Sequence, residues 1–105
     1  MPYVIASFRP KPGKDDELLD VVRDHMPTLR KHDFITDRPC QVMRAPDGCI
    51  IEVFQWKSQQ AIEDAHNNED VRALWKRYEA CCDYIPLKDL PNAGEYFPGF
   101  EAVDV

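Results

Sequence analysis

The stretch from Cys49 to Tyr78 constrains the fold more than any other part of the chain. A dense apolar run, CIIEVFQW, ends at Lys57-Ser58 and is followed at once by apolar residues at helical spacing. Short runs rich in β-branched and aromatic residues are typical of strands, and apolar residues three and four apart are typical of one helix face. The stretch therefore predicts a strand that leads directly into a helical region, with Trp56 at the junction.

Upstream of this unit the pattern predicts a strand, a helix and a second strand. Residues 3–9 are β-rich and precede a Pro-Lys-Pro-Gly breaker. Residues 15–31 carry an apolar face, with acidic residues at the start and basic residues at the end, as the helix dipole favours. Pro27 is expected to kink this helix or to open its last turn. A second strand is expected over residues 35–45, with Pro39 interrupting its first half and a Pro-Asp-Gly turn leading to the next strand.

Downstream, Ser58 is expected to cap the next helix, and an Asn-Asn pair divides the helical region in two. Pro86 closes that region, and residues 100–103 form a short final strand. The order β-α-β-β-α-(α)-β is that of the ferredoxin-like split βαβ fold, so the predicted fold class is α+β, with one domain over residues 1–105. One apolar face of such a sheet lacks helices and needs a cover, most simply a second copy of the chain.

Composition narrows the partners that the chain is expected to bind. Thirteen basic residues against nineteen acidic ones give a formal net charge of −6, which argues against a nucleic-acid or anionic-membrane surface. No apolar run approaches the roughly 18 residues of a membrane span. The first residues lack a signal-peptide pattern, so the expected location is cytoplasmic. The cysteines and histidines lack the spacing of a ligand set, and no bound metal is expected.

Several pieces of the sequence resemble the antibiotic-biosynthesis-monooxygenase-like superfamily. They are the KPGK segment, the Pro-Asp-Gly turn, the stretch EVFQWKSQQAIEDAH and the apolar helix around Trp75. The shared pattern is a strand that ends in a tryptophan, here Trp56, followed by a polar turn and a helix with a histidine, here His66. The resemblance covers most of residues 3–80 and implies a dimeric α/β barrel. The segment 87–100 lies outside the shared pattern, and the sequence assigns it no role.

The same resemblance implies several activities, which include cofactor-free quinone-forming monooxygenases, haem-degrading enzymes and isomerases. The haem-degrading branch uses an asparagine on the first strand together with a tryptophan and a histidine in the helical region. The first strand of this chain has no asparagine, so neither haem degradation nor a bound cofactor is expected.

Glu52 is the first candidate for a catalytic residue. Strand alternation places it on the same face as Phe54 and Trp56. A carboxyl group desolvated among apolar side chains has a raised pKa, which suits a general acid or base. The alternative is that Glu52 pairs with Arg9 or Arg44 in the barrel or at the dimer edge, and both arginines are counted among the candidate ligand-binding residues.

His66 is the second candidate, because an imidazole beside a pocket transfers protons near neutral pH. The alternative is that His66 pairs along the helix surface with Glu63 or Asp70. His25 and His32 lie two helical turns apart, about 10.5 Å, which is too far for one metal ion. Both are expected at the surface.

Two functions remain open on this basis. The first is a small homodimeric enzyme, a cofactor-free monooxygenase or a related one, that acts on a hydrophobic or aromatic small molecule. In this case Glu52 and His66 handle protons, while Phe54, Trp56 and Tyr78 shape the pocket rather than only filling the core. The second is a non-catalytic or stress-related dimer that binds a small molecule. An open cavity faced by Glu52 or His66 favours the first, and a barrel filled with side chains favours the second.

Overall fold

The computed structural model describes all residues from 1 to 105. One antiparallel sheet has the strand order β4-β1-β3-β2-β5. Its strands are β1 (Tyr3–Pro10), β2 (Gln41–Arg44), β3 (Ile50–Gln55), β4 (Cys82–Ile85) and β5 (Glu101–Ala102). The helices are α1 (Asp15–Lys31), α2 (Gln59–His66), α3 (Glu69–Cys81) and the short 3-10 helix η1 (Leu87–Asp89).

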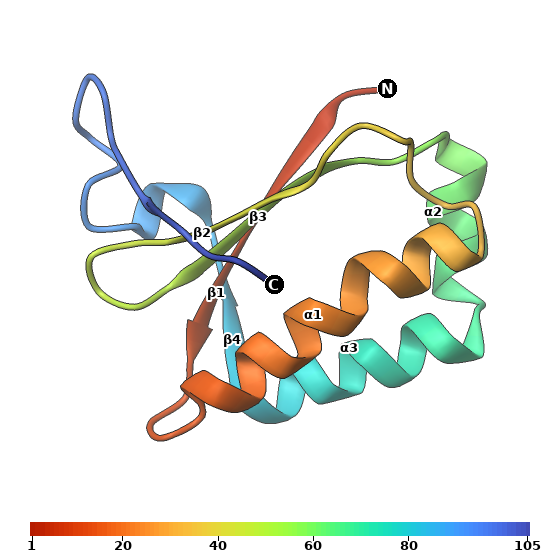
Figure 1. Ribbon diagram of the computed structural model, residues 1–105, viewed down its shortest axis with the longest axis horizontal. Helices are drawn as coiled ribbons and strands as arrows, with labels where there is room; N and C mark the ends of the chain where they lie inside the picture. Colours follow the sequence, from red (N-terminus) through yellow and green to blue (C-terminus); the bar gives the residue numbers. More distant parts are fainter.

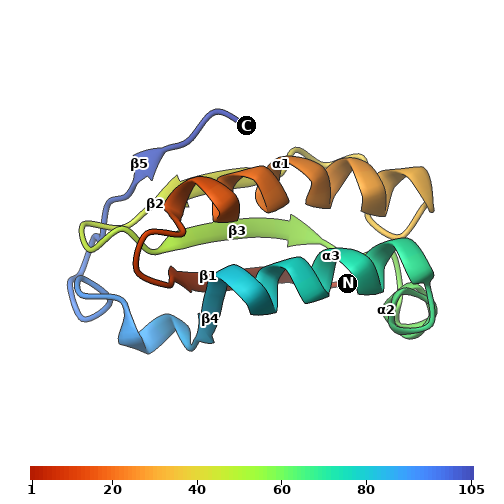
Figure 2. The same cartoon turned by 90° about the horizontal axis from the view of Figure 1, so that it is seen from below.

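The helices α1 and α3 lie on one face of this sheet, and the segment 87–100 lies on the other. Figure 1 shows α1 and α3 on one side of the strands and η1 with the loop that follows it, in lighter blue, on the other. In the second view α1 and α3 run side by side over the strands (Figure 2). The strands β1 to β4 and the helices between them have the ferredoxin-like arrangement, so the predicted α+β fold class is confirmed. No helix is both long and apolar enough to cross a membrane.

Local sequence signals explain where the helices begin. The Ser58 side chain accepts a hydrogen bond from the backbone N–H of Ala61, which confirms the predicted cap of α2. Asn68 caps α3 in the same way through the N–H of Val71. The helix α1 continues through Pro27 to its basic last turn.

The prediction for the second strand is wrong in its extent. The second strand was expected over residues 35–45, but only Gln41–Arg44 pair as a strand, and Ile35 forms an isolated bridge with Trp56. Pro39 removes one backbone donor from the intervening segment, which therefore leaves the sheet.

The strand that completes the ferredoxin-like sheet is β4, a part of the chain expected within the helical region that ends at Pro86. Cys81 ends α3 and Cys82 begins the strand without an intervening turn, so no breaker marks the change. The expected final strand is present as β5, but it pairs with β2 at the opposite edge as an additional strand.

The face of the sheet opposite α1 and α3, called here the far face, is covered over one half by the segment 87–100. Leu90 packs in a buried cluster with Ala45, Cys49 and Ile51, and further residues of the C-terminal segment pack around it. In the other half, Ile5 is 50% exposed. The sequence predicted that a second copy covers this face, whereas the segment 87–100 already covers part of it.

Candidate functional site

An open pocket of about 390 Å³ lies between the helices and the face of β1 and β3 that the helices cover. We call it the aromatic pocket, because phenylalanine, tryptophan, tyrosine and histidine rings make up most of its wall. The residues that line it are Val4, Ala6, Phe8, His25, Phe54, Trp56, His66, Trp75, Tyr78, Glu79 and Tyr84.

A larger hollow of about 510 Å³ lies between α1, β2 and the C-terminal residues. Its charged side chains, Arg23, Arg30 and Asp104, belong to exposed residues, and it contains no buried acid–base pair. Nowhere in the chain do three or more His, Cys, Asp or Glu side chains converge as a metal-ligand set. The aromatic pocket is therefore the better candidate site, because ionisable groups with defined partners lie in its wall.

The carboxyl group of Glu52 is buried directly behind the aromatic pocket, with 1% of the residue exposed. Its Oε1 accepts a hydrogen bond of 2.6 Å from the Tyr78 hydroxyl, and its Oε2 lies 3.0 Å from Nδ1 of His25. Three elements, β3, α3 and α1, thus meet at one carboxyl group. We call Glu52, His25 and Tyr78 together the Glu52 network. Glu52 does not line the pocket itself, but both of its partners do.

The strand register explains how this carboxyl group fits beneath the helices. Ala6 of β1 and Val42 of β2 lie opposite Glu52 on its two neighbouring strands. Directly paired residues point to the same face of a sheet, so both share the helix side with Glu52. The small side chain of Ala6 leaves room above the sheet for the imidazole and the phenol. Neither Arg9 nor Arg44 contacts the carboxyl group, so the alternative that Glu52 pairs with an arginine is wrong.

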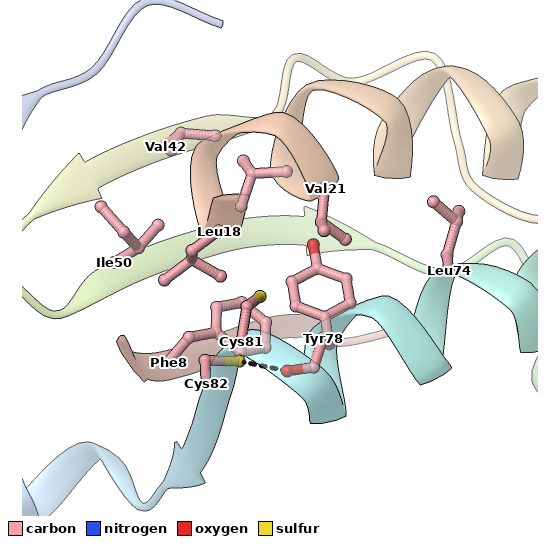
Figure 3. Packing of buried hydrophobic residues seen from close by; sticks show 10 residues of the cluster. Phe8, Leu18, Val21, Val42, Ile50, Leu74, Tyr78, Cys81 and Cys82 are labelled. Carbon is pink, nitrogen blue, oxygen red and sulfur yellow. Dashed lines mark hydrogen bonds between the residues drawn. The ribbon is translucent and has the colours of Figure 1, made fainter. Parts of the chain in front are cut away.

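Tyr78 reaches from α3 into a buried apolar cluster that it forms with Phe8, Leu18 and Val21 among others, as Figure 3 shows. Its ring stacks on Phe8, with the centroids 4.7 Å apart and the planes at 22°. Burial, and then the neighbouring Glu52 carboxylate, raise the pKa of the Tyr78 hydroxyl far above its usual value of 10. Tyr78 is therefore a phenol that keeps its proton and donates it in a hydrogen bond to Glu52.

His25 is 5% exposed, so the prediction that it lies at the surface is wrong. Its ring stands edge-on to Phe54 and to Tyr78, with centroid separations of 5.8 and 5.2 Å. The sequence did contain a signal for this position. His25 follows Val21 by four residues and Val22 by three, which places it within the apolar stripe of α1.

His66 lies at the exposed rim of the aromatic pocket, at the end of α2. Its Nδ1 is 2.8 Å from the carbonyl oxygen of Ile62, so Nδ1 carries a proton and donates it to that oxygen. The ring stands edge-on to Trp75 at 4.9 Å. The expected surface pairing with Asp70 is absent, because Asp70 pairs with His32 at 2.8 Å instead.

The remaining predicted ligand-binding residues divide into two groups. Phe54 and Trp56 line the aromatic pocket together with Tyr78. Arg9 and Arg44 lie outside it, and Arg9 faces Asp47 at 3.9 Å. The structure thus brings together Phe54, Trp56, Tyr78 and His66 around one hollow, adds His25, and leaves the two arginines apart.

Comparison with protein-family models matches residues 1–77 to the family described as antibiotic biosynthesis monooxygenase. The comparisons with curated proteins and with solved structures gave no match. The matched region runs from β1 through most of α3, and includes Glu52, His25 and His66. Because the match covers well over half of the sequence, the chain belongs to the antibiotic biosynthesis monooxygenase family.

Proposed function

We propose that this protein is an enzyme of the cofactor-free monooxygenase type that acts on a hydrophobic, aromatic small molecule in the aromatic pocket. The observation that carries the proposal is an open pocket walled by aromatic rings, with two imidazoles and a phenol among its lining side chains. Small-molecule sites typically combine a mostly apolar wall with a few polar groups that fix the orientation of the ligand. Family membership supports the same class of activity.

The proposed reaction is the oxidation of a hydroxyarene to a quinone. One hydroxynaphthalene and one O₂ would give one naphthoquinone and one water, and the substrate would supply all four electrons. The task of the chain is then to hold the ring, to exclude water and to move protons.

His66 and Glu52 have different places in this scheme. With Nδ1 of His66 donating to the carbonyl of Ile62, the neutral ring leaves Nε2 as a proton acceptor at the pocket rim. Glu52 acts from behind the wall, through its contacts with His25 and Tyr78. Phe54 and Trp56 supply flat surfaces against which an aromatic substrate stacks.

Incubation with a panel of hydroxynaphthalenes under ¹⁸O₂ tests this function. We expect oxygen uptake and a naphthoquinone that carries one ¹⁸O atom, with a lower rate for His66→Ala. His32→Ala is the matched control, because His32 is also a helix-end histidine but lies outside the pocket. A product without ¹⁸O would exclude monooxygenase activity. Equal rates for the two variants would exclude the role of His66.

A second candidate function is non-catalytic binding of a hydrophobic small molecule. It is favoured by one observation, namely that both oxygens of Glu52 already have partners within the chain, as in a purely structural polar cluster. In that case hydroxynaphthalenes would bind to the protein without oxygen uptake.

We also propose that the protein is a homodimer joined through the uncovered half of the far face. Tyr3 and Ile5 are 46% and 50% exposed there, on a strand whose other face is packed against the helices. An exposed apolar sheet surface is commonly covered by a partner. Sedimentation equilibrium should show a dimer at micromolar concentration and a monomer for Ile5→Lys. A monomeric wild-type protein would rule out this assembly.

A further inference from the structure

We propose that His25 is the base that removes a hydroxyl proton from the ligand at Nε2, and that Glu52 and Tyr78 are positioning residues that hold its ring. The inference rests on the proposed function, because it requires a ligand in the aromatic pocket. It narrows the ligand to molecules with an ionisable hydroxyl group, such as a phenol or an enol.

The contacts within the Glu52 network decide which nitrogen of His25 carries the proton. Tyr78 donates to Oε1 of Glu52 at 2.6 Å, and Oε2 lies 3.0 Å from Nδ1 of His25. An unprotonated Nδ1 would set its lone pair against a carboxylate oxygen at that distance in a buried site, which is unfavourable. A proton on Nδ1 converts the same contact into a hydrogen bond. The neutral ring then has its acceptor at Nε2.

Of the two ring nitrogens of His25, Nε2 is the one available to accept a hydrogen bond from a ligand. No group of the chain forms a hydrogen bond with it, whereas Nδ1 has Glu52. Only two side-chain nitrogen or oxygen atoms are fully buried without a partner, namely Ser7 Oγ and Asn92 Oδ1. Nε2 of His25 has no partner and is not one of them, so this atom is not fully buried. His25 lines the aromatic pocket, and we therefore assign this free nitrogen to contact with a molecule bound there.

The proposed step is a proton transfer with no other bond change. The O–H bond of the ligand breaks, its proton binds Nε2, and the electron pair stays on the ligand oxygen. The positive charge of the imidazolium is balanced by the Glu52 carboxylate at 3.0 Å. Phe54 and Tyr78 stand edge-on to the imidazole and restrict its rotation. The other ionisable groups around the pocket are His66, Glu79 and Tyr84, which are all exposed.

The binding of 4-nitrophenol tests this step without any turnover, because its neutral and ionised forms absorb at different wavelengths. The uncharged analogue 4-nitroanisole reports pocket occupancy alone. For the wild-type protein we expect bound 4-nitrophenol to ionise at least about tenfold more readily than in solution, since a nearby cation favours the phenolate. His25→Asn retains an N–H donor toward Glu52 but lacks Nε2, so it should bind 4-nitroanisole normally and lose the enhanced ionisation. Glu52→Gln should reduce the enhancement with the same 4-nitroanisole affinity.

Each other outcome overturns the inference. If both compounds bind but ionisation is equal in the wild type and His25→Asn, His25 is not the base, while the proposed function stands. If neither compound binds, the proposed function and the inference both fail. Long-range ¹H–¹⁵N spectra of the wild-type protein give a test that does not depend on the folding of a variant. We expect the neutral His25 ring to be protonated at Nδ1, and protonation at Nε2 would overturn the assignment.

Discussion

The two faces of the sheet differ in whether their buried polar side chains have hydrogen-bond partners. On the helix side, Glu52 is buried with a phenol and an imidazole in hydrogen-bonding contact. On the far face, the hydroxyl of Ser7 is buried beside Ile51 and Ile85 and has no partner. A buried polar group without a partner is costly, and one with partners is not. The buried polar contacts of Glu52 thus lie on the helix side, beside the aromatic pocket, whereas the far face around Ser7 is a packing surface.

Glu52→Ala should give the largest loss of stability, about 3–5 kcal/mol in the free energy of unfolding. The substitution removes the acceptor for both Tyr78 and His25 and leaves these two groups unpaired in the core. Urea unfolding at one fixed protein concentration measures the change. Glu79→Ala is the matched control, because Glu79 is an exposed glutamate at the pocket wall, and it should stay within about 0.5 kcal/mol of the wild type. Equal effects of the two substitutions would contradict the importance of the network.

Leu90→Ala tests whether the C-terminal segment is part of the core of the far face. Leu90 is buried against Ala45, Cys49 and Ile51, so its truncation should lower the free energy of unfolding by about 3 kcal/mol. Leu87→Ala removes the same atoms from a residue that is 46% exposed and should cost less than about 1 kcal/mol. A negligible effect of Leu90→Ala would mean that the segment does not cover the sheet in solution.

Tyr78→Phe removes only a hydroxyl group from the helix side. We expect the free energy of unfolding to fall by about 2 kcal/mol, because a hydrogen bond to a charged acceptor is lost and Oε1 of Glu52 keeps only its longer contact of 3.2 Å with Nδ1 of His25. The raised pKa of this hydroxyl also predicts that it stays protonated in alkaline titration until the protein unfolds. An unchanged stability would show that the 2.6 Å contact makes no net contribution.

Ser7→Ala removes a hydroxyl group from the far face and should have the opposite sign. Because the Ser7 hydroxyl is buried without a partner, its removal should raise the free energy of unfolding by about 1 kcal/mol. Thermal and urea unfolding of the Ser7 and Tyr78 variants, measured side by side, compare the two faces directly. A loss of stability for both would remove the distinction between them.

The sequence was most informative where structure depends on neighbouring residues. The alternation around Glu52 correctly gave its face of the strand, and Ser58 correctly gave the start of α2. The partners of Glu52 were not predictable in this way, because His25 and Tyr78 are 27 and 26 residues away and meet it only when two helices pack. The burial of His25 follows from its position in the apolar stripe of α1, whereas its spacing of two turns from His32 carries no information about burial.

The strand β4 and the C-terminal segment were missed for the same physical reason. Cys82–Ile85 is too short to show alternation, and it is a strand because it pairs with the distant β1. Similarly, Leu90 is buried only because the chain returns across the far face. Such contacts depend on tertiary packing and leave little trace in the local pattern.

A calorimetric titration with 1-naphthol tests whether a hydrophobic ligand binds on the helix side of the sheet. Ala6 and Ile5 are neighbours on β1 that face opposite sides, and only Ala6 lines the aromatic pocket. We expect the wild type and Ile5→Phe to bind 1-naphthol with similar affinity, whereas Ala6→Phe should fill the pocket and abolish binding. Binding that persists in Ala6→Phe and is lost in Ile5→Phe would place the ligand on the far face and contradict a site in the aromatic pocket.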